Sequence, residues 1–242
     1  MSTKTVAQYL IDALLTRGVR HVFGIPGDYS LAFYQCLEES ELQVINMCDE
    51  QGAGFAADGY ARATGLGVAC VTYGVGGLKL ANTTAQAYAE RSPVIVISGA
   101  PGLQERCGDP LLHHKIRDFD TQLSIFRELT AAAQVLTSPA AAGSVIERAL
   151  DAAASEQRPV YLELPRDLVA VHVETPRARL QSKPSQASAA ALNGNDSSAC
   201  RAAVDAICAM LSHATQPVLL VGVEAARFGV RRQIVQLAEE HN

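Results

Sequence analysis

The sequence contains no run that approaches the roughly eighteen consecutive apolar residues of a membrane span. Its N-terminus carries Lys4 and then an amphipathic pattern interrupted by Gln8 and Asp12, without the unbroken apolar stretch of a secretory signal. It also lacks a basic run, and a formal net charge of -5 argues against a surface that follows nucleic-acid phosphates. We therefore expect a cytoplasmic protein whose partners are small molecules or proteins, with no membrane and no nucleic acid among them.

The cysteines form no CxxC pair, and none has a histidine at the spacing of a metal-ligand set. Reduced cytoplasmic thiols are the expected state. The six positions are Cys36, Cys48, Cys70, Cys107, Cys200 and Cys208.

What the chain does have is a regular alternation of short apolar stretches with amphipathic helical patterns, and 48% of its residues are apolar. A helix is expected from Val6 to Leu15, stopped by Gly18. Strands are then expected at 21–25, 43–47, 67–72, 93–98, 131–136 and 160–164, with helices at 31–39, 51–63, 78–90 and 140–154. Strands that are apolar throughout, such as PVIVIS at 93–98, indicate a sheet covered on both faces. The pattern predicts an α/β domain with a doubly wound, mostly parallel sheet flanked by helices.

Periodicity is lost from 175 to 198, where Ser, Ala, Pro, Gln, Asn and Gly give the composition of a surface linker. A helix at 199–213, a strand at 217–223 and a helix at 226–240 follow. One strand cannot satisfy its own edges, so we expect these residues to be the truncated start of a second α/β domain. The expected organisation is a domain at 1–174, a linker at 175–198 and an incomplete domain at 199–242.

Ionisable residues are placed where the predicted strands run into loops, and ligands of doubly wound sheets bind beyond the carboxyl ends of the strands. Asp28 lies in the turn GIPGD, Glu50 follows Asp49 after a strand, and His113 and His114 lie in a long connection from 99 to 120. Long loops are often functional, and neighbouring imidazoles can move protons near neutral pH. Each has an ordinary alternative: Asp28 as a helix cap, the acidic pair as complements of a helix dipole, and the histidines as surface residues. The remaining histidines are expected to be structural.

Glycines mark two further features. Gly74-Val75-Gly76-Gly77 opens a predicted helix with bare backbone amides, but it matches a dinucleotide fingerprint poorly and has no P-loop lysine. The helix after Glu50 has a face of Gly and Ala, which implies that a partner subunit or a flat ligand packs close to it.

Taken together, the motifs resemble a known family. They are GIPGD at 24–28, CDEQGAGFAADGYARATG at 48–65, TYGVGGLKLANTTAQAYAERSPVIVISGAPG at 72–102, LLHH at 111–114, DTQ at 120–122 and RPVYLELPRD at 158–167. In order and spacing they resemble the thiamine-diphosphate-dependent 2-oxo acid decarboxylases, which include pyruvate, indolepyruvate and phenylpyruvate decarboxylases. The resemblance runs from Val6 to about Val173 and corresponds to the N-terminal pyrimidine-binding domain of that family.

The resemblance implies a role for each site residue. Glu50 matches the glutamate that bonds the aminopyrimidine of the cofactor, and Asp28, His113 and His114 match the cluster that manages protons after carbon dioxide leaves. The other implied cofactor contacts are Pro26, Gly27, Thr72, Gly74 and Val75. No metal ligand is expected in this chain, because the Gly-Asp-Gly stretch through which the family binds Mg²⁺ and diphosphate has no match here.

The implied activity is decarboxylation of an aromatic or other bulky 2-oxo acid to an aldehyde, in a homodimer or homotetramer formed through the pyrimidine-domain face. This fragment alone would hold half a site, so we expect it to be inactive and to bind cofactor weakly. Two alternatives stay open. One is an acetolactate-synthase-like carboligase, although such enzymes generally lack both Asp28 and the histidine pair; the other is a non-catalytic binding or assembly module.

Overall fold

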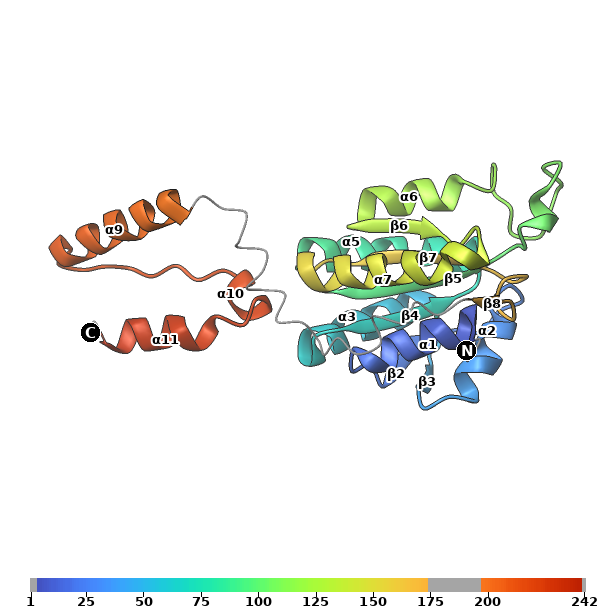
Figure 1. Ribbon diagram of the computed structural model, residues 1–242, viewed down its shortest axis with the longest axis horizontal. Helices are drawn as coiled ribbons and strands as arrows, with labels where there is room; N and C mark the ends of the chain where they lie inside the picture. Colours follow the sequence, from blue (N-terminus) through green and yellow to red (C-terminus); the bar gives the residue numbers. More distant parts are fainter. Residues whose placement is uncertain (1–3, 174–196, 241–242) are drawn as a thin grey trace. The chain divides into compact units, whose positions relative to one another are not determined.

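Residues 4–173 and 197–240 are described by the structure, a computed structural model (Figure 1). The chain divides into two compact units, Met1–Lys183 and Pro184–Asn242. The boundary falls within the predicted linker at 175–198, which lies outside the described residues except for its last two positions.

The first unit is built on a six-stranded sheet in which every neighbouring pair of strands is parallel. The predicted fold class is therefore confirmed, and each strand begins within a residue of its predicted start. In spatial order the strands are β3 (Gln43–Asn46), β2 (His21–Gly24), β4 (Gly67–Val71), β5 (Val94–Ala100), β7 (Val160–Pro165) and β6 (Ala132–Val135).

Helices cover both faces of this sheet, as Figure 1 shows. Alternate residues of β5 divide between the two faces: Ile95 and Ile97 belong to one apolar cluster, and Val94 and Val96 to the other. The first cluster includes residues of α1 (Val6–Thr16), α2 (Leu31–Glu38) and α7 (Pro139–Glu156). The second includes residues of α3 (Glu50–Thr64), α5 (Ala81–Ala89) and α6 (Thr121–Leu129).

The small-residue face of α3 packs within its own chain. A Cβ atom added to Gly54 would lie 2.1 Å from Oγ1 of Thr83 in α5, and one added to Gly67 of β4 would lie 2.1 Å from the carbonyl oxygen of Ala57. The sequence attributed this face to a partner subunit or a flat ligand. At these positions the close neighbours are instead α5 and β4, which need the space that a side chain would fill.

The predicted helix at 78–90 is two helices, α4 (Val75–Lys79) and α5. The backbone amide of Leu80 donates to the carbonyl of Gly77, and this i to i+3 bond tightens the chain between them. The sequence analysis missed α6, whose buried residues Leu123 and Phe126 are spaced as on one helix face. Among residues 4–173 and 197–240, no helix combines the length and the apolar character needed to span a bilayer.

A second, two-stranded sheet was also missed. Here β1 (Lys4–Thr5) pairs antiparallel with β8 (His172–Val173). Thr5 then begins α1 with a capping box, since its hydroxyl accepts from the amide of Gln8 and the Gln8 side chain accepts from the amide of Thr5. Two-residue strands are too short to leave a periodic signal in the sequence.

The described part of the second unit contains α9 (Ser197–His213), α10 (Glu224–Arg227) and α11 (Arg231–Glu240). The strand predicted at 217–223 is not formed, and Val218 and Leu220 are 92% and 96% exposed. That prediction was wrong because a strand needs a hydrogen-bonded neighbour, and none is present among residues 197–240. The helix predicted at 226–240 is interrupted near Gly229, whose φ is +73°.

Candidate active site

The carboxyl ends of β2 and β4 form the switch point of the first sheet. From β2 the chain passes to β3 on one side and then to β4 on the other. In doubly wound sheets, the carboxyl edge at such a reversal is where ligands bind, and we call this edge the crevice. Asp28, after β2, and Thr72, after β4, meet across it, because Oγ1 of Thr72 donates to Oδ1 of Asp28 at 3.3 Å. The placement of both residues at this edge, expected from the sequence, is what the structure has.

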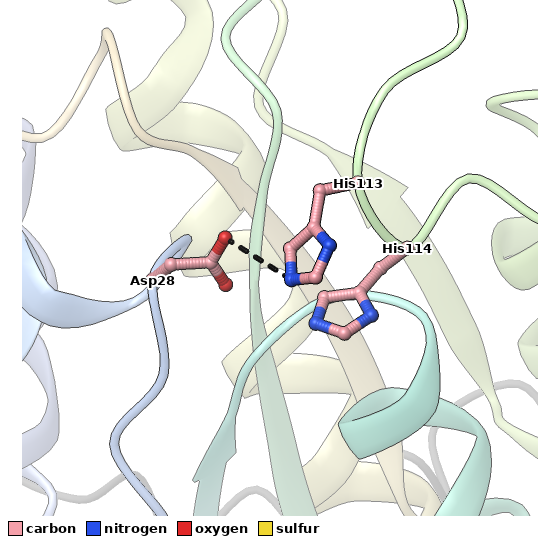
Figure 2. A group of neighbouring side chains, drawn as sticks. All are labelled: Asp28, His113 and His114. Carbon is pink, nitrogen blue, oxygen red and sulfur yellow. Dashed lines mark ion pairs between the residues drawn. The ribbon is translucent and has the colours of Figure 1, made fainter.

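Asp28, His113 and His114 lie together at this edge (Figure 2). Oδ2 of Asp28 lies 3.8 Å from Nε2 of His113, and the two imidazole rings are 3.6 Å apart between centroids. The aspartate comes from the turn after β2, and the histidines come from the long connection between β5 and α6. The side chains of Asp28 and His113 are 44% and 65% exposed. The cluster is thus open to a ligand, and its groups are close enough to exchange protons through one intervening molecule.

Two tertiary contacts fix the histidines. The buried Tyr29 hydroxyl donates to the carbonyl of His113 at 2.9 Å. His114 has φ +62°, a left-handed conformation that non-glycine residues seldom adopt. Its carbonyl lies against Gly74, where an added Cβ atom would be only 2.5 Å away. A glycine at 74 is therefore needed for the backbone of His114 to take its place.

The alternative that Asp28 caps α2 is not what the structure has. The N-cap of α2 is Ser30, and the Asp28 carboxylate faces Thr72 and His113. Asp49, by contrast, is an ordinary cap of α3. Its Oδ1 accepts from the amide of Gly52 at 2.7 Å, and this bond lowers the pKa of the Asp49 carboxyl.

Glu50 is the first residue of α3, and its side chain is only 19% exposed. Its Oε1 lies 3.6 Å from where a Cβ of Gly76 would be, so the carboxylate borders the glycine-rich start of α4. Next to Gly76 is Val75, an apolar residue that is 59% exposed. A shielded acceptor beside exposed apolar surface fits a flat heteroaromatic ring that carries a hydrogen-bond donor. The residues present thus fit a pyrimidine.

Lys79 is a neighbour of Glu50 that the sequence analysis missed. Its Nζ lies 3.4 Å from Oε2 of Glu50 and 3.7 Å from Oδ2 of Asp49. Because the lysine is 45% exposed, an ion pair of this kind contributes less than about 1 kcal/mol. The sequence could have pointed to Lys79, because it comes one turn after the start of a helix that begins at the crevice.

The other predicted cofactor contacts lie at the same edge, but they differ in how exposed they are. Gly27 lies against Thr72, since a Cβ atom added to it would be 2.6 Å from that of Thr72. Thr72 and Gly74 are buried, while Pro26 is exposed. The structure thus puts two of these residues beneath the crevice and leaves Pro26 and Val75 open to a ligand.

Comparison with known proteins decides the family. The domain family described as "Thiamine pyrophosphate enzyme, N-terminal TPP binding domain" matches residues 4–124, which include Asp28, Glu50 and both site histidines. The chain belongs to this family. The resemblance inferred from its motifs is thereby confirmed.

Two relatives show which members of the thiamine pyrophosphate enzymes are similar. An indole-3-pyruvate decarboxylase of Azospirillum brasilense is 43% identical over 236 residues, or 97% of this chain and 41% of that protein. A pyruvate decarboxylase of Hanseniaspora uvarum is 36% identical over 242 residues, or 99% of this chain and 42% of that protein. The chain spans about two fifths of the length of the curated relatives it matches.

The ligand atoms of Asp28, His113 and His114 all lie within 4.8 Å of one another, which makes this cluster a candidate metal site as well. In the part of the chain that the structure describes, it is the one group of three or more His, Cys, Asp or Glu residues with this spacing. Two imidazoles and one carboxylate suit Zn²⁺ or a related transition metal, whereas Mg²⁺ prefers oxygen ligands. The donors therefore do not match the Mg²⁺ that the family resemblance implies.

Proposed function

We propose that the full-length protein decarboxylates a 2-oxo acid to an aldehyde with thiamine diphosphate and Mg²⁺, and that this chain supplies the pyrimidine half of the site. The observation that carries the proposal is the meeting of Asp28, His113 and His114 at the switch point, in a member of the thiamine pyrophosphate enzymes. A cluster of two imidazoles and a carboxylate can both deliver and receive protons near neutral pH.

Glu50 is the residue proposed to hold the cofactor ring. When bound, the cofactor supplies the electron sink of the reaction. The carboxylate of Glu50 accepts a hydrogen bond at the pyrimidine ring, and its shielding from water strengthens that bond. Pro26, Gly27, Thr72, Gly74 and Val75 are proposed to shape the surface around it.

Asp28, His113 and His114 are proposed to manage the protons that the reaction takes up once carbon dioxide has left. Oδ1 of Asp28 accepts from Thr72, which leaves Oδ2 toward His113. The rings of His113 and His114 are 3.6 Å apart between centroids, and one ligand atom from each of the three side chains lies within 4.8 Å of the others. A small molecule bound at this cluster would therefore have a proton donor or acceptor of each of the three residues close to it.

An aromatic or bulky substrate is the preferred class. The relative named as an indole-3-pyruvate decarboxylase shares 43% identity with this chain, and the Hanseniaspora relative named as a pyruvate decarboxylase shares 36%. Two exposed apolar residues, Leu31 at the start of α2 (56%) and Val75 at the start of α4 (59%), support association of two or more copies as well as apolar substrates. We propose a homodimer or homotetramer on this basis. Cytoplasmic localisation remains a prediction of the sequence.

The test is an assay of the full-length protein on phenylpyruvate, indolepyruvate and pyruvate, with thiamine diphosphate and Mg²⁺. We expect aldehyde from at least one aromatic substrate, and a fall of about 100-fold or more in kcat for Glu50→Gln. Asp49→Asn is the matched control, because asparagine also caps a helix and Asp49 lies next to Glu50. Unimpaired turnover by Glu50→Gln would remove the proposal. Acetolactate from pyruvate with little aldehyde would point to a carboligase.

A further inference from the structure

Glu163 is a fully buried carboxylate that the proposed function does not use. It lies in β7 at 0% exposure, with Oε1 accepting from Nη2 of Arg106 at 2.8 Å and Oε2 accepting from the hydroxyl of Tyr161 at 2.8 Å. Burying a carboxylate costs several kcal/mol unless its oxygens are bonded. Both oxygens are bonded here, and the two partners point toward different parts of the site.

The hydrogen bonds continue from Tyr161 to Gly74 through a single amide. Nε2 of Gln122 donates to the Tyr161 hydroxyl at 2.6 Å and to Oγ of Ser98 at 2.9 Å. Its Oε1 accepts from the backbone amide of Gly74 at 2.8 Å. Gln122 is 0% exposed, and both of its amide hydrogens and its oxygen are used. The orientation of the side chain is therefore fixed.

The two ends of this bridge are the two segments that carry the proposed site. At one end, Arg106 also donates through Nε to the carbonyl of Pro101 and lies 5.8 Å from the ring of Phe119, so it ties the beginning of the histidine loop (residues 101–119) to its end. At the other end, Gly74 precedes Val75 and lies against the carbonyl of His114.

We infer that Glu163, Tyr161 and Gln122 are positioning residues. With Arg106 and Gly74 they form a buried bridge that sets the histidine loop and the glycine turn (residues 72–76) in one fixed relation. The roles of His113 and His114 rest on the proposed function, but the coupling of the two segments does not.

The bridge is better suited to orientation than to stability. The ring of Tyr161 stacks on Phe126 with centroids 4.3 Å apart, and a phenylalanine at 161 would keep that contact. Hydrogen bonds inside a protein contribute little net stability, whereas a fully satisfied buried network holds its members in one arrangement. Glu163, Tyr161 and Gln122 are hydrogen-bonded one to the next, and the polar atoms of each side chain all have a partner. Such positioning requires a network of this kind.

The chain contains a matched control. Tyr9 of α1 is buried at 3% exposure and donates to Oε1 of Glu147 at 3.0 Å, while Oε2 of Glu147 accepts from Arg17 at 2.7 Å. This is the same tyrosine, glutamate and arginine arrangement, placed between α1 and α7 away from the crevice. Tyr9→Phe removes the tyrosine–glutamate bond, and Tyr161→Phe removes the equivalent bond together with the one that Gln122 donates to the hydroxyl.

The experiment is hydrogen exchange, followed by mass spectrometry, on full-length wild type and both variants without added substrate. We expect Tyr161→Phe, which removes two hydrogen bonds, to speed exchange about fivefold or more in peptides covering both 72–80 and 101–119, since one hydrogen bond of ordinary strength corresponds to about fivefold. Tyr9→Phe should change only peptides of α1 and α7. If Tyr161→Phe leaves either site segment at the wild-type rate, the coupling is refuted.

Kinetics provide a second measurement if the full-length protein is active. Misplaced proton donors slow the chemical step, so kcat should fall for Tyr161→Phe with KM nearly unchanged, while Tyr9→Phe should match wild type. If Tyr161→Phe does not fold, Glu163→Gln is used instead, because glutamine has nearly the same shape as glutamate. Absence of any decarboxylase activity would overturn the proposed function and leave the exchange result to decide the bridge.

Discussion

The carboxylate of Asp28 and the imidazole of His113 face each other across 3.8 Å, although one follows β2 and the other lies in the loop after β5. Parallel strands bring their carboxyl ends to one edge of the sheet, so loops far apart in sequence meet there. The hydroxyl of Thr72 bonds to the other oxygen of Asp28, which leaves Oδ2 toward the histidine.

Replacing Asp28 by asparagine should remove the acidic member of this cluster with little change of shape. We expect aldehyde release to fall by about 100-fold or more, within the range for loss of a general acid or base. The control is Asp109→Asn, since Asp109 lies in the histidine loop, its side chain is 71% exposed, and its Oδ1 accepts from Nζ of Lys115. Aldehyde release from Asp28→Asn at the wild-type rate would show that the cluster has no part in proton transfer.

Zinc should bind to the same cluster in the full-length protein and inhibit the proposed decarboxylation. The ligand atoms of Asp28, His113 and His114 lie within 4.8 Å of one another, and their nitrogen donors favour Zn²⁺ or Co²⁺ over Mg²⁺. Titration with Co²⁺, monitored by its visible absorption, should show binding at one site, and Asp28→Asn should lower the affinity of that site about tenfold or more. His172→Gln, a change at an exposed histidine, should leave that titration as it is. Equal Co²⁺ affinity in wild type and Asp28→Asn would mean that the ion binds elsewhere.

A methyl group at position 74 should displace His114. An alanine there has φ +67° and puts its Cβ 2.5 Å from the His114 carbonyl, so Gly74→Ala combines backbone strain with a collision. Gly65→Ala has φ +97° and open space, and it should cost only the strain, about 1 kcal/mol. Thermal unfolding should show loss of stability in both variants, and activity should be lost in Gly74→Ala alone. Equal activity of the two variants would indicate that the histidine loop shifts enough to accommodate the methyl group without harm to the site.

Asp58 should make the stability of the domain depend on acid. Burial by itself raises the pKa of this carboxyl, but hydrogen bonds from Arg62 and Gln86, with the charge of Arg62, outweigh burial and hold the pKa below its usual value. A lowered folded pKa means that the stabilisation is present above the unfolded pKa and is lost as pH falls below about 4. Asp58→Asn should therefore cost about 1 kcal/mol at pH 7, and the difference from wild type should shrink toward pH 3.

The measurement is chemical unfolding at a series of pH values. Asp151→Asn is the comparison, because Asp151 is 58% exposed beside Arg17 and its pair should contribute less than about 0.5 kcal/mol. A difference between wild type and Asp58→Asn that does not change with pH would show that packing, and not the charge, accounts for the loss.

The two units differ in how well their elements could be predicted. The strands β4, β5 and β7 gave the clearest signal, because buried strands are mostly apolar and every residue of these three is buried. The apolar stretch at 217–223 carries the same local signal and forms no strand, since hydrogen-bonded pairing is not a property of the segment itself. Helix α6 was missed because it follows a long loop, and its first residue could not be recognised in the sequence.

Site residues divide in the same way. Asp28, Glu50 and the histidines could be proposed from the sequence, because each comes after a predicted strand and stands in a family motif. Lys79 and Gln122 could not, since their partners are reached only across the fold.

By itself, the sequence determined the doubly wound sheet and the family, and it predicted the edge at which ligands are expected, because apolar periodicity and contiguous motifs are local properties of the chain. Only the tertiary structure decided that Asp28 faces His113, that Gly54 packs on α5 and that Gln122 holds the amide of Gly74. Those contacts join residues far apart in sequence, and their distances are set by the register of parallel strands and the packing of helices against them.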